Sequence, residues 1–141
     1  MLRDIIINKP KLIQGEGRVG TYGDLLKTGR RGDNLTPHHI PSNAYMKAKV
    51  QEYATNQGIA MMMEHLSPGK GGRHRQTLSY GKSPNLNLSP RDTLAREICD
   101  IRAIYYDQGL YDPTIRQALQ RLIKLNKLTW SNIFDKGVTN R

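Results

Sequence analysis

Residues 89–109 read SPRDTLAREICDIRAIYYDQG, and this stretch predicts an amphipathic helix. Ser89 is a suitable N-cap residue, Pro90 takes the first helical position, and Asp92 takes the place of the acidic partner in a capping box. Apolar residues then recur at spacings of four, three and four along one helical face, at Leu94, Ile98, Ile101 and Tyr105. Gly109 is a typical residue for the end of such a helix.

A second helix is expected to begin at Asp112-Pro113. Its apolar face has spacings of four, three and three, at Ile115, Leu119, Leu122 and Leu125. Because few residues separate the two helices, we expect an antiparallel helical hairpin at about 89–128.

The segment before this hairpin mixes helix, strand and loop signals. Ser42 follows Pro41 and is a plausible helix N-cap, and the apolar run 59–63 (IAMMM) favours a core strand. We therefore expect an α+β fold, in which the segment at about 33–80 packs within a mainly helical domain. The predicted domain covers 20–141, and 1–19 is expected to be a lead-in or linker from a larger polypeptide, with a short strand possible at 5–7.

The charge of the chain limits its partners. Lys and Arg number 22 against 12 acidic residues among the 141, which gives a net charge of +10. The excess is spread along the sequence, and this favours a polyanionic partner such as nucleic acid, although a soluble protein with a high pI would look the same. Cys99 is the only cysteine, so an internal disulfide and a Cys-based zinc site are excluded. No apolar run is long enough for a membrane segment.

The four histidines all lie within residues 38–74, where regular structure is least evident. Pro37 and Pro41 bracket the pair His38-His39, and proline restricts the backbone on both sides of the pair. The pair is therefore expected to lie in an extended segment, where neighbouring side chains point to opposite sides. One imidazole could then ligate a metal ion while the other removes a proton from water.

The donor atoms that the sequence offers near this pair limit the kind of metal ion. Asp33 lies five residues before His38 and could supply an oxygen ligand. Imidazole suits Zn, Ni or Co, whereas Mg or Mn would prefer more oxygen ligands.

The second histidine cluster lies behind a glycine-rich turn. His74 is flanked by Arg73 and Arg75 after the stretch GKGG at 69–72. Arginine forks onto phosphate oxygens, and glycine lets the backbone approach a phosphate closely. The sequence thus predicts phosphate binding here, or else a solvated basic hairpin tip. Further basic residues predicted to contact nucleic acid are Arg30, Arg31 and Lys70.

Together, DNLTPHHIPS (33–42) and MEHLSPGKGGRHRQTLSYG (63–81) resemble the HNH/endonuclease VII superfamily of His-Me finger, or ββα-metal, nucleases. They are similar in particular to C-terminal toxin domains of bacterial polymorphic toxins of the Rhs type. The resemblance implies His38 as a metal ligand, His39 as the general base, His74 as a further ligand, and His65 as an additional one. It also implies a small ββα-metal finger at about 33–80, embedded in the mainly helical domain. The finger would hold a divalent ion, which could be Mg, Mn, Zn or Ni.

The resemblance carries expectations about biology as well. It implies a domain secreted as part of a larger toxin, acting in the cytoplasm of a target bacterium, with an acidic immunity protein in the producing cell. The expected reaction is phosphodiester hydrolysis, on DNA rather than RNA, with Arg73 and Arg75 orienting the phosphate. Two other functions stay open: a metal-independent RNase toxin, and a non-catalytic nucleic-acid-binding module stabilised by zinc. Tyr22 and Tyr80 are expected to pack in the fold rather than stack on bases.

Overall fold

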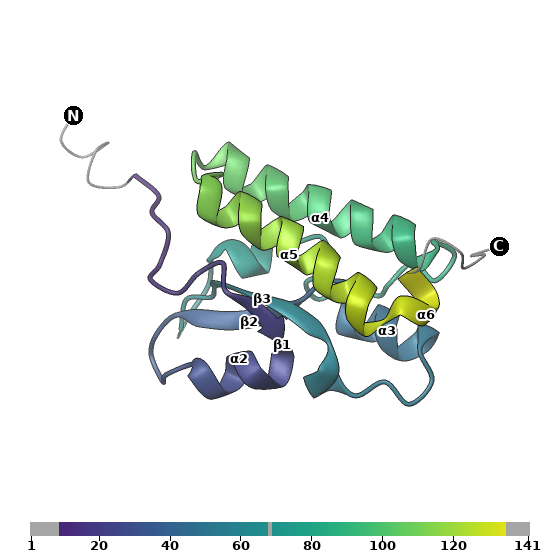
Figure 1. Ribbon diagram of the computed structural model, residues 1–141. Coiled ribbons are helices and arrows are strands. Elements are labelled where there is room, and N and C mark those ends of the chain that lie inside the picture. Colours follow the sequence, from purple (N-terminus) through teal and green to yellow (C-terminus); the bar gives the residue numbers. More distant parts are fainter. Residues whose placement is uncertain (1–8, 68, 135–141) are drawn as a thin grey trace.

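The computed structural model describes residues 9–67 and 69–134 and has the expected α+β architecture (Figure 1). Three strands form an antiparallel sheet in the order β1-β3-β2, with β1 at Val19–Thr21, β2 at Leu35–His39 and β3 at Ile59–Glu64. The strand possible at 5–7 lies outside the described residues.

Helices surround this sheet, and α4 and α5 lie side by side across one of its faces (Figure 1). The α-helices are α2 (Tyr22–Thr28), α3 (Asn43–Lys49), α4 (Pro90–Asp107), α5 (Pro113–Thr129) and α6 (Ser131–Phe134). Two short 3₁₀ turns are η1 (Thr55–Gln57) and η2 (Arg73–Gln76). Within the described ranges, none of the helices has the length and apolar character that crossing a membrane requires.

The predicted helical hairpin is confirmed, together with its capping residues. The Ser89 hydroxyl accepts the backbone N–H of Asp92 at 3.1 Å, and the Asp112 carboxylate accepts that of Ile115 at 3.0 Å. Both contacts satisfy N–H groups that have no partner inside the helix. Gly109 has a φ of 72°, a conformation that favours glycine, and the chain reverses there between α4 and α5.

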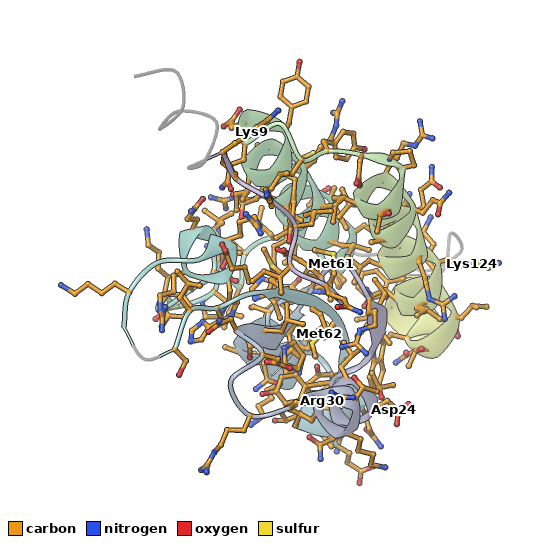
Figure 2. The ribbon with its side chains drawn as sticks, turned by 90° about the vertical axis from the view of Figure 1, so that its left-hand side faces the viewer. Lys9, Asp24, Arg30, Met61, Met62 and Lys124 are labelled. Atoms are coloured by element: carbon orange, nitrogen blue, oxygen red, sulfur yellow. The ribbon has the colours of Figure 1, made fainter. Side chains whose placement is uncertain are left out.

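Strand β3 is the centre of the core, and its side chains alternate between two faces. Ile59, Met61 and Met63 pack with α4 and α5 in the larger hydrophobic cluster. Ala60 and Met62 face the other way and pack against Leu25 of α2 in a smaller cluster. Figure 2 shows Met61 and Met62 on opposite sides of the strand. The methionine run is thus a core strand, as its apolar character predicted.

In the region of the predicted ββα finger, the two strands are present, but the predicted helix after them is replaced by a shorter element. β2 and β3 pair directly, with His38 opposite Met61 and His39 opposite Ala60, and α3 lies between them in the sequence. After β3 the chain forms a loop and then only the four-residue turn η2, where the prediction had an α-helix. The reason is local: Gly72 has a φ of 94°, and a Cβ there would lie 2.8 Å from the Glu64 carbonyl oxygen.

The predicted start of the domain at residue 20 is wrong for the described residues before it. Strand β1 begins at Val19, and the Gly17 N–H donates to the Met62 carbonyl at 2.9 Å. The Glu16 side chain is buried in the centre of the molecule, where it contacts Arg73 and Tyr105. The described residues just before position 20 are therefore part of the folded core.

Candidate active site

The adjacent histidines lie on β2, and their side chains take opposite sides, as an extended segment predicted. The His38 ring meets His74 edge to face, with ring centroids 5.0 Å apart and planes at 68°. The His39 ring instead stacks on Tyr22 at 4.3 Å, with planes within 14° of parallel. The two histidines thus occupy different surroundings although they are neighbours in sequence.

His39 is held in one tautomer by a backbone carbonyl. Its Nε2 lies 2.9 Å from the Thr55 carbonyl oxygen, which can only accept, so Nε2 carries the proton. The lone pair is then on Nδ1. Burial is the main cause that lowers the pKa of His39 below its usual value, so the ring is neutral at pH 7. Such an imidazole is positioned as a base.

His65, His74 and Arg75 form a hydrogen-bonded chain beside His38. Arg75 Nη2 donates to His65 Nε2 at 3.0 Å, which leaves the His65 proton on Nδ1. That Nδ1 lies 2.9 Å from His74 Nδ1, so it donates to the His74 ring. Arg75 Nη1 also donates to the carbonyl oxygens of Leu66 and Gly71, which fixes the loop before η2. Among residues 9–67 and 69–134, the other two N–H groups of Arg75, on Nε and Nη2, make no hydrogen bond.

Two of these histidines are strongly biased toward the neutral form. Burial, with smaller contributions from the nearby His74 and His39 rings, lowers the pKa of His38 to about 3. Burial, followed by His65 and Arg75, lowers the pKa of His74 to about 4. At neutral pH these imidazoles therefore offer lone pairs, the form in which histidine ligates a metal ion.

His38, His39 and His74 line a groove of about 370 Å³ along β2. Its wall includes Tyr22, His38, His39, His74, Tyr80 and Lys82. Sequence reasoning placed Tyr22 and Tyr80 in the packing of the fold, but both contribute to this groove. Lys82 was missed, because it lies in a polar connector whose position relative to the histidines could not be inferred from spacing.

The position of Arg73 differs most clearly from the prediction that this residue binds phosphate. Its side chain is 2% exposed, and its guanidinium binds both Glu16 carboxylate oxygens at 2.6 and 2.7 Å. Two further N–H groups donate to the Gln108 side chain and the Lys11 carbonyl, and Nη1 also lies 3.5 Å from the Glu64 carboxylate. Four of the five N–H groups thus donate hydrogen bonds inside the fold, so Arg73 braces the core, and the predicted phosphate contact by this residue is wrong. Its neighbour Arg75 points the other way, toward the histidines.

Asp33 does not join the histidine cluster. Its two carboxylate oxygens accept the backbone N–H groups of Arg30 and Leu35, both at 2.9 Å, so they shape the turn before β2. The side chain lines a separate cavity with Arg18 and Arg30. The prediction of Asp33 as a metal ligand is therefore wrong. Arg30, Arg31 and Lys70 are exposed, and none of the three lines the histidine groove.

The donor set determines how well a metal ion would fit. In the part of the chain that the structure describes, no three His, Cys, Asp or Glu side chains are already arranged as a metal site. His74 nevertheless contacts two other histidine rings, those of His38 and His65, with ring centroids 5.0 and 4.9 Å away. The His65 and His74 nitrogens are 2.9 Å apart, and ligands of one tetrahedral ion with bonds of 2.0–2.1 Å stand about 3.3 Å apart. To hold an ion between these two Nδ1 atoms, the rings would separate by a few tenths of an ångström, and the His65 proton would move to Nε2 in place of the Arg75 hydrogen bond.

Comparison with family models, with curated protein sequences and with solved structures gives no match. The interpretation of the groove therefore rests on its own geometry.

Proposed function

We propose that the chain is a metal-dependent endonuclease that hydrolyses phosphodiester bonds in the groove along β2. The observation that carries this proposal is the state of His39: a neutral imidazole whose proton is fixed on Nε2 by the Thr55 carbonyl. Its free Nδ1 can take the proton of an attacking water. Stacking on Tyr22 keeps the ring in this orientation.

His38, His74 and His65 are the residues that would hold the ion. His38 and His74 line the same groove as the proposed base, and His65 contacts His74. A divalent ion bound there would stabilise the charge that builds on the phosphate and the leaving oxygen. Because this donor set is imidazole without a neighbouring carboxylate, it favours Zn or Ni over Mg or Mn. Arg75 lies beside His65, and its guanidinium can contact a phosphate there, since an ion on His65 Nδ1 would release the hydrogen bond that Arg75 makes to Nε2.

The substrate side of the proposal follows from charge. The exposed ammonium of Lys82 and the guanidinium of Arg75 flank the histidines, and the chain carries a net charge of +10. Such a groove attracts a polyanion, and Tyr22 and Tyr80 on its wall offer faces for bases. DNA is the favoured polymer in this proposal.

The proposal is tested by incubating plasmid DNA and a structured RNA with the protein in EDTA and with Mg²⁺, Mn²⁺, Ni²⁺ or Zn²⁺ in turn. We expect cleavage with Ni²⁺ or Zn²⁺ and none in EDTA. His39→Ala should lower the rate by about 10²–10⁴ while the thermal unfolding curve stays that of a folded protein. Arg121→Ala, which removes an exposed positive charge on α5 away from the groove, is the matched control and should keep its activity.

Other outcomes would select another function. Cleavage of RNA that persists in excess EDTA would favour a metal-independent RNase. That mechanism also needs a protonated acid near neutral pH, and the low pKa values of His38 and His74 do not favour it. Salt-dependent binding without cleavage under any condition would point to a zinc-stabilised binding module. Full activity in His39→Ala would refute the assignment of the base.

We extend the proposal to the biological setting that the sequence resemblance implies. The domain would be the toxic part of a larger secreted protein that acts in the cytoplasm of a target bacterium. An acidic immunity protein would then cover the basic groove in the producing cell. Arrest of growth when the wild-type chain is expressed inside a bacterium, but not when His39→Ala is expressed, would support this setting.

A further inference from the structure

A second cavity of about 350 Å³ opens beside the histidine groove and shares three of its wall residues. Ser42, Ser79 and Lys82 line both spaces. The deeper wall of the second cavity comes from α4, through Thr93 and Glu97, and its outer wall comes from the connector at 78–88. The two spaces are therefore neighbouring parts of one surface depression.

Two polar side chains in this cavity have unused hydrogen-bonding atoms. Glu97 is 7% exposed, and its Oε2 accepts the Ser42 N–H at 3.1 Å, but its Oε1 has no partner among the described residues. Thr93 is 6% exposed, and its hydroxyl lies next to the Tyr45 hydroxyl without a well-formed hydrogen bond to any described residue. Buried polar groups almost always have partners, so the unpaired Glu97 oxygen in particular indicates a ligand or ordered water. Leu78, Pro84 and Leu88 supply apolar walls around them.

The rim of the cavity has the opposite character. Lys82 and Arg96 are both exposed there and carry positive charge. A ligand that suits the whole cavity thus presents a hydrogen-bond donor at its inner end and negative charge at its outer end. A nucleotide has both: an amino group on the base, and the phosphate. The volume lies near the lower end of the range of about 300–1,000 Å³ for small-ligand pockets, which suits one nucleoside.

We propose that this cavity is a base-recognition subsite, in which Glu97 Oε1 accepts a hydrogen bond from the exocyclic amino group of an unstacked base next to the scissile phosphate. This inference rests on the proposed nuclease function and specifies its substrate. Lys82, shared by both spaces, would contact the phosphate between the base and the histidines. A base can enter such a pocket only after it leaves the stack, so the substrate is single-stranded or locally opened nucleic acid.

The geometry also predicts which bases bind. Cytosine presents its amino group at the edge of the ring. Uracil has only a ring N–H between two carbonyl oxygens, and both of these would face the Glu97 carboxylate. An acceptor at the inner end of the cavity therefore discriminates against uracil. A hydrogen bond to a charged group contributes about 1.5–3 kcal/mol, which corresponds to a preference of about tenfold or more.

Glu97→Gln is a sharp test because the Ser42 N–H still needs an acceptor. The amide oxygen of the substituted side chain would stay on Ser42, and its NH₂ group would then take the place of Oε1. The substitution thus turns an acceptor facing the cavity into a donor and keeps the contact that anchors α3 to α4. A donor there suits a carbonyl oxygen of uracil and repels the cytosine amino group.

The experiment measures binding of fluorescein-labelled dC12 and dU12 by fluorescence anisotropy, in EDTA so that metal-dependent cleavage is excluded, and at pH 8. Burial raises the pKa of Glu97 to about 7, so the carboxylate is ionised at this pH. The wild-type protein should bind dC12 about tenfold more tightly than dU12. Glu97→Gln should lose or reverse this order. Asp92→Asn, which removes an exposed charge of α4 outside the cavity, should keep it.

Equal binding of dC12 and dU12 by the wild-type protein would overturn the subsite, and so would a preserved preference for dC12 in folded Glu97→Gln. If Glu97→Gln does not fold, Thr93→Val replaces it: this variant should weaken dC12 binding, and an unchanged affinity would count against the proposal. The assay needs no catalysis, so it separates failure of this subsite from failure of the nuclease proposal.

Discussion

Arg73 and Glu16 form a two-point ion pair in the centre of the molecule, with Nε and Nη2 of the arginine 2.7 and 2.6 Å from the two carboxylate oxygens. Both side chains are almost completely buried. The pair ties the turn η2, which carries His74, to the chain before β1. A residue that the sequence presents as a phosphate ligand is therefore a structural support of the candidate active site.

Arg73→Ala should destabilise the fold by about 3–5 kcal/mol, because it leaves the Glu16 carboxylate buried without its partner. Urea denaturation measures this loss. The exposed Arg121 provides the comparison, since its replacement by alanine should change stability by no more than about 0.5 kcal/mol. An Arg73→Ala protein of wild-type stability with weakened DNA binding would restore the phosphate role that the structure rejects.

Two tyrosines with buried hydroxyls should respond in opposite ways to removal of that group. Tyr53 Oη is buried without a hydrogen-bond partner, and burial raises its pKa to about 12. Tyr53→Phe should therefore be neutral or stabilising by up to about 1 kcal/mol. Tyr105 Oη donates to Glu16 Oε2 at 2.5 Å, so Tyr105→Phe should cost about 1–3 kcal/mol. Equal losses in thermal denaturation of the two variants would contradict this difference.

Glu97 should make stability depend on pH in a direction unusual for a carboxylate. Burial raises its pKa from 4.5 to about 7, so between these values the folded protein keeps a proton that the unfolded chain has released. Stability then falls as the pH rises from about 4.5 to 7, by at most about 3 kcal/mol. Glu97→Gln removes this effect, so its stability relative to wild type should increase between pH 5 and pH 8. Parallel pH profiles in urea denaturation would rule it out.

Metal binding should be visible as thermal stabilisation without any nucleic acid. Ni²⁺ or Zn²⁺ in excess should raise the Tm by several degrees, because the ion binds only the folded arrangement of His38, His65 and His74. Mg²⁺ should have little effect at the same concentration. His74→Ala should abolish the shift, whereas Asp33→Ala should retain it even if its starting Tm is lower. A shift that depends on Asp33 would reinstate it as a ligand.

Local patterns predicted the elements of this fold well. The spacing of Leu94, Ile98, Ile101 and Tyr105 indicated α4, and the capping residues of α4 and α5 act as expected. Alternation along a strand also predicted that His38 and His39 take different sides, and this depends only on the backbone period. Such features need no knowledge of the rest of the chain.

Long-range contacts could not be predicted in the same way. Glu16 accepts a hydrogen bond from Tyr105, which is 89 positions away in the sequence. The segment around Glu16, which the sequence presented as a linker, is therefore part of the core. Arg73 and Arg75 look equivalent around His74, but one points into the core and the other toward the groove. Tyr22 stacks on His39 because α2 begins directly after β1, which pairs with β3 in the same sheet as β2. Spacing in one sequence cannot specify which buried carboxylate meets which arginine.

Pro37 lies in the middle of β2, at the edge of the sheet and on the wall of the histidine groove. The Ile40 N–H points to β3, where it donates to the Ile59 carbonyl, so by alternation the nitrogen of Pro37 faces away from the sheet. Proline has no N–H to offer there. An extended peptide, or the same strand of another molecule, therefore finds a gap in the row of donors on this side. The proline thus protects the edge of the sheet against strand-by-strand aggregation and leaves the histidine groove beside it open.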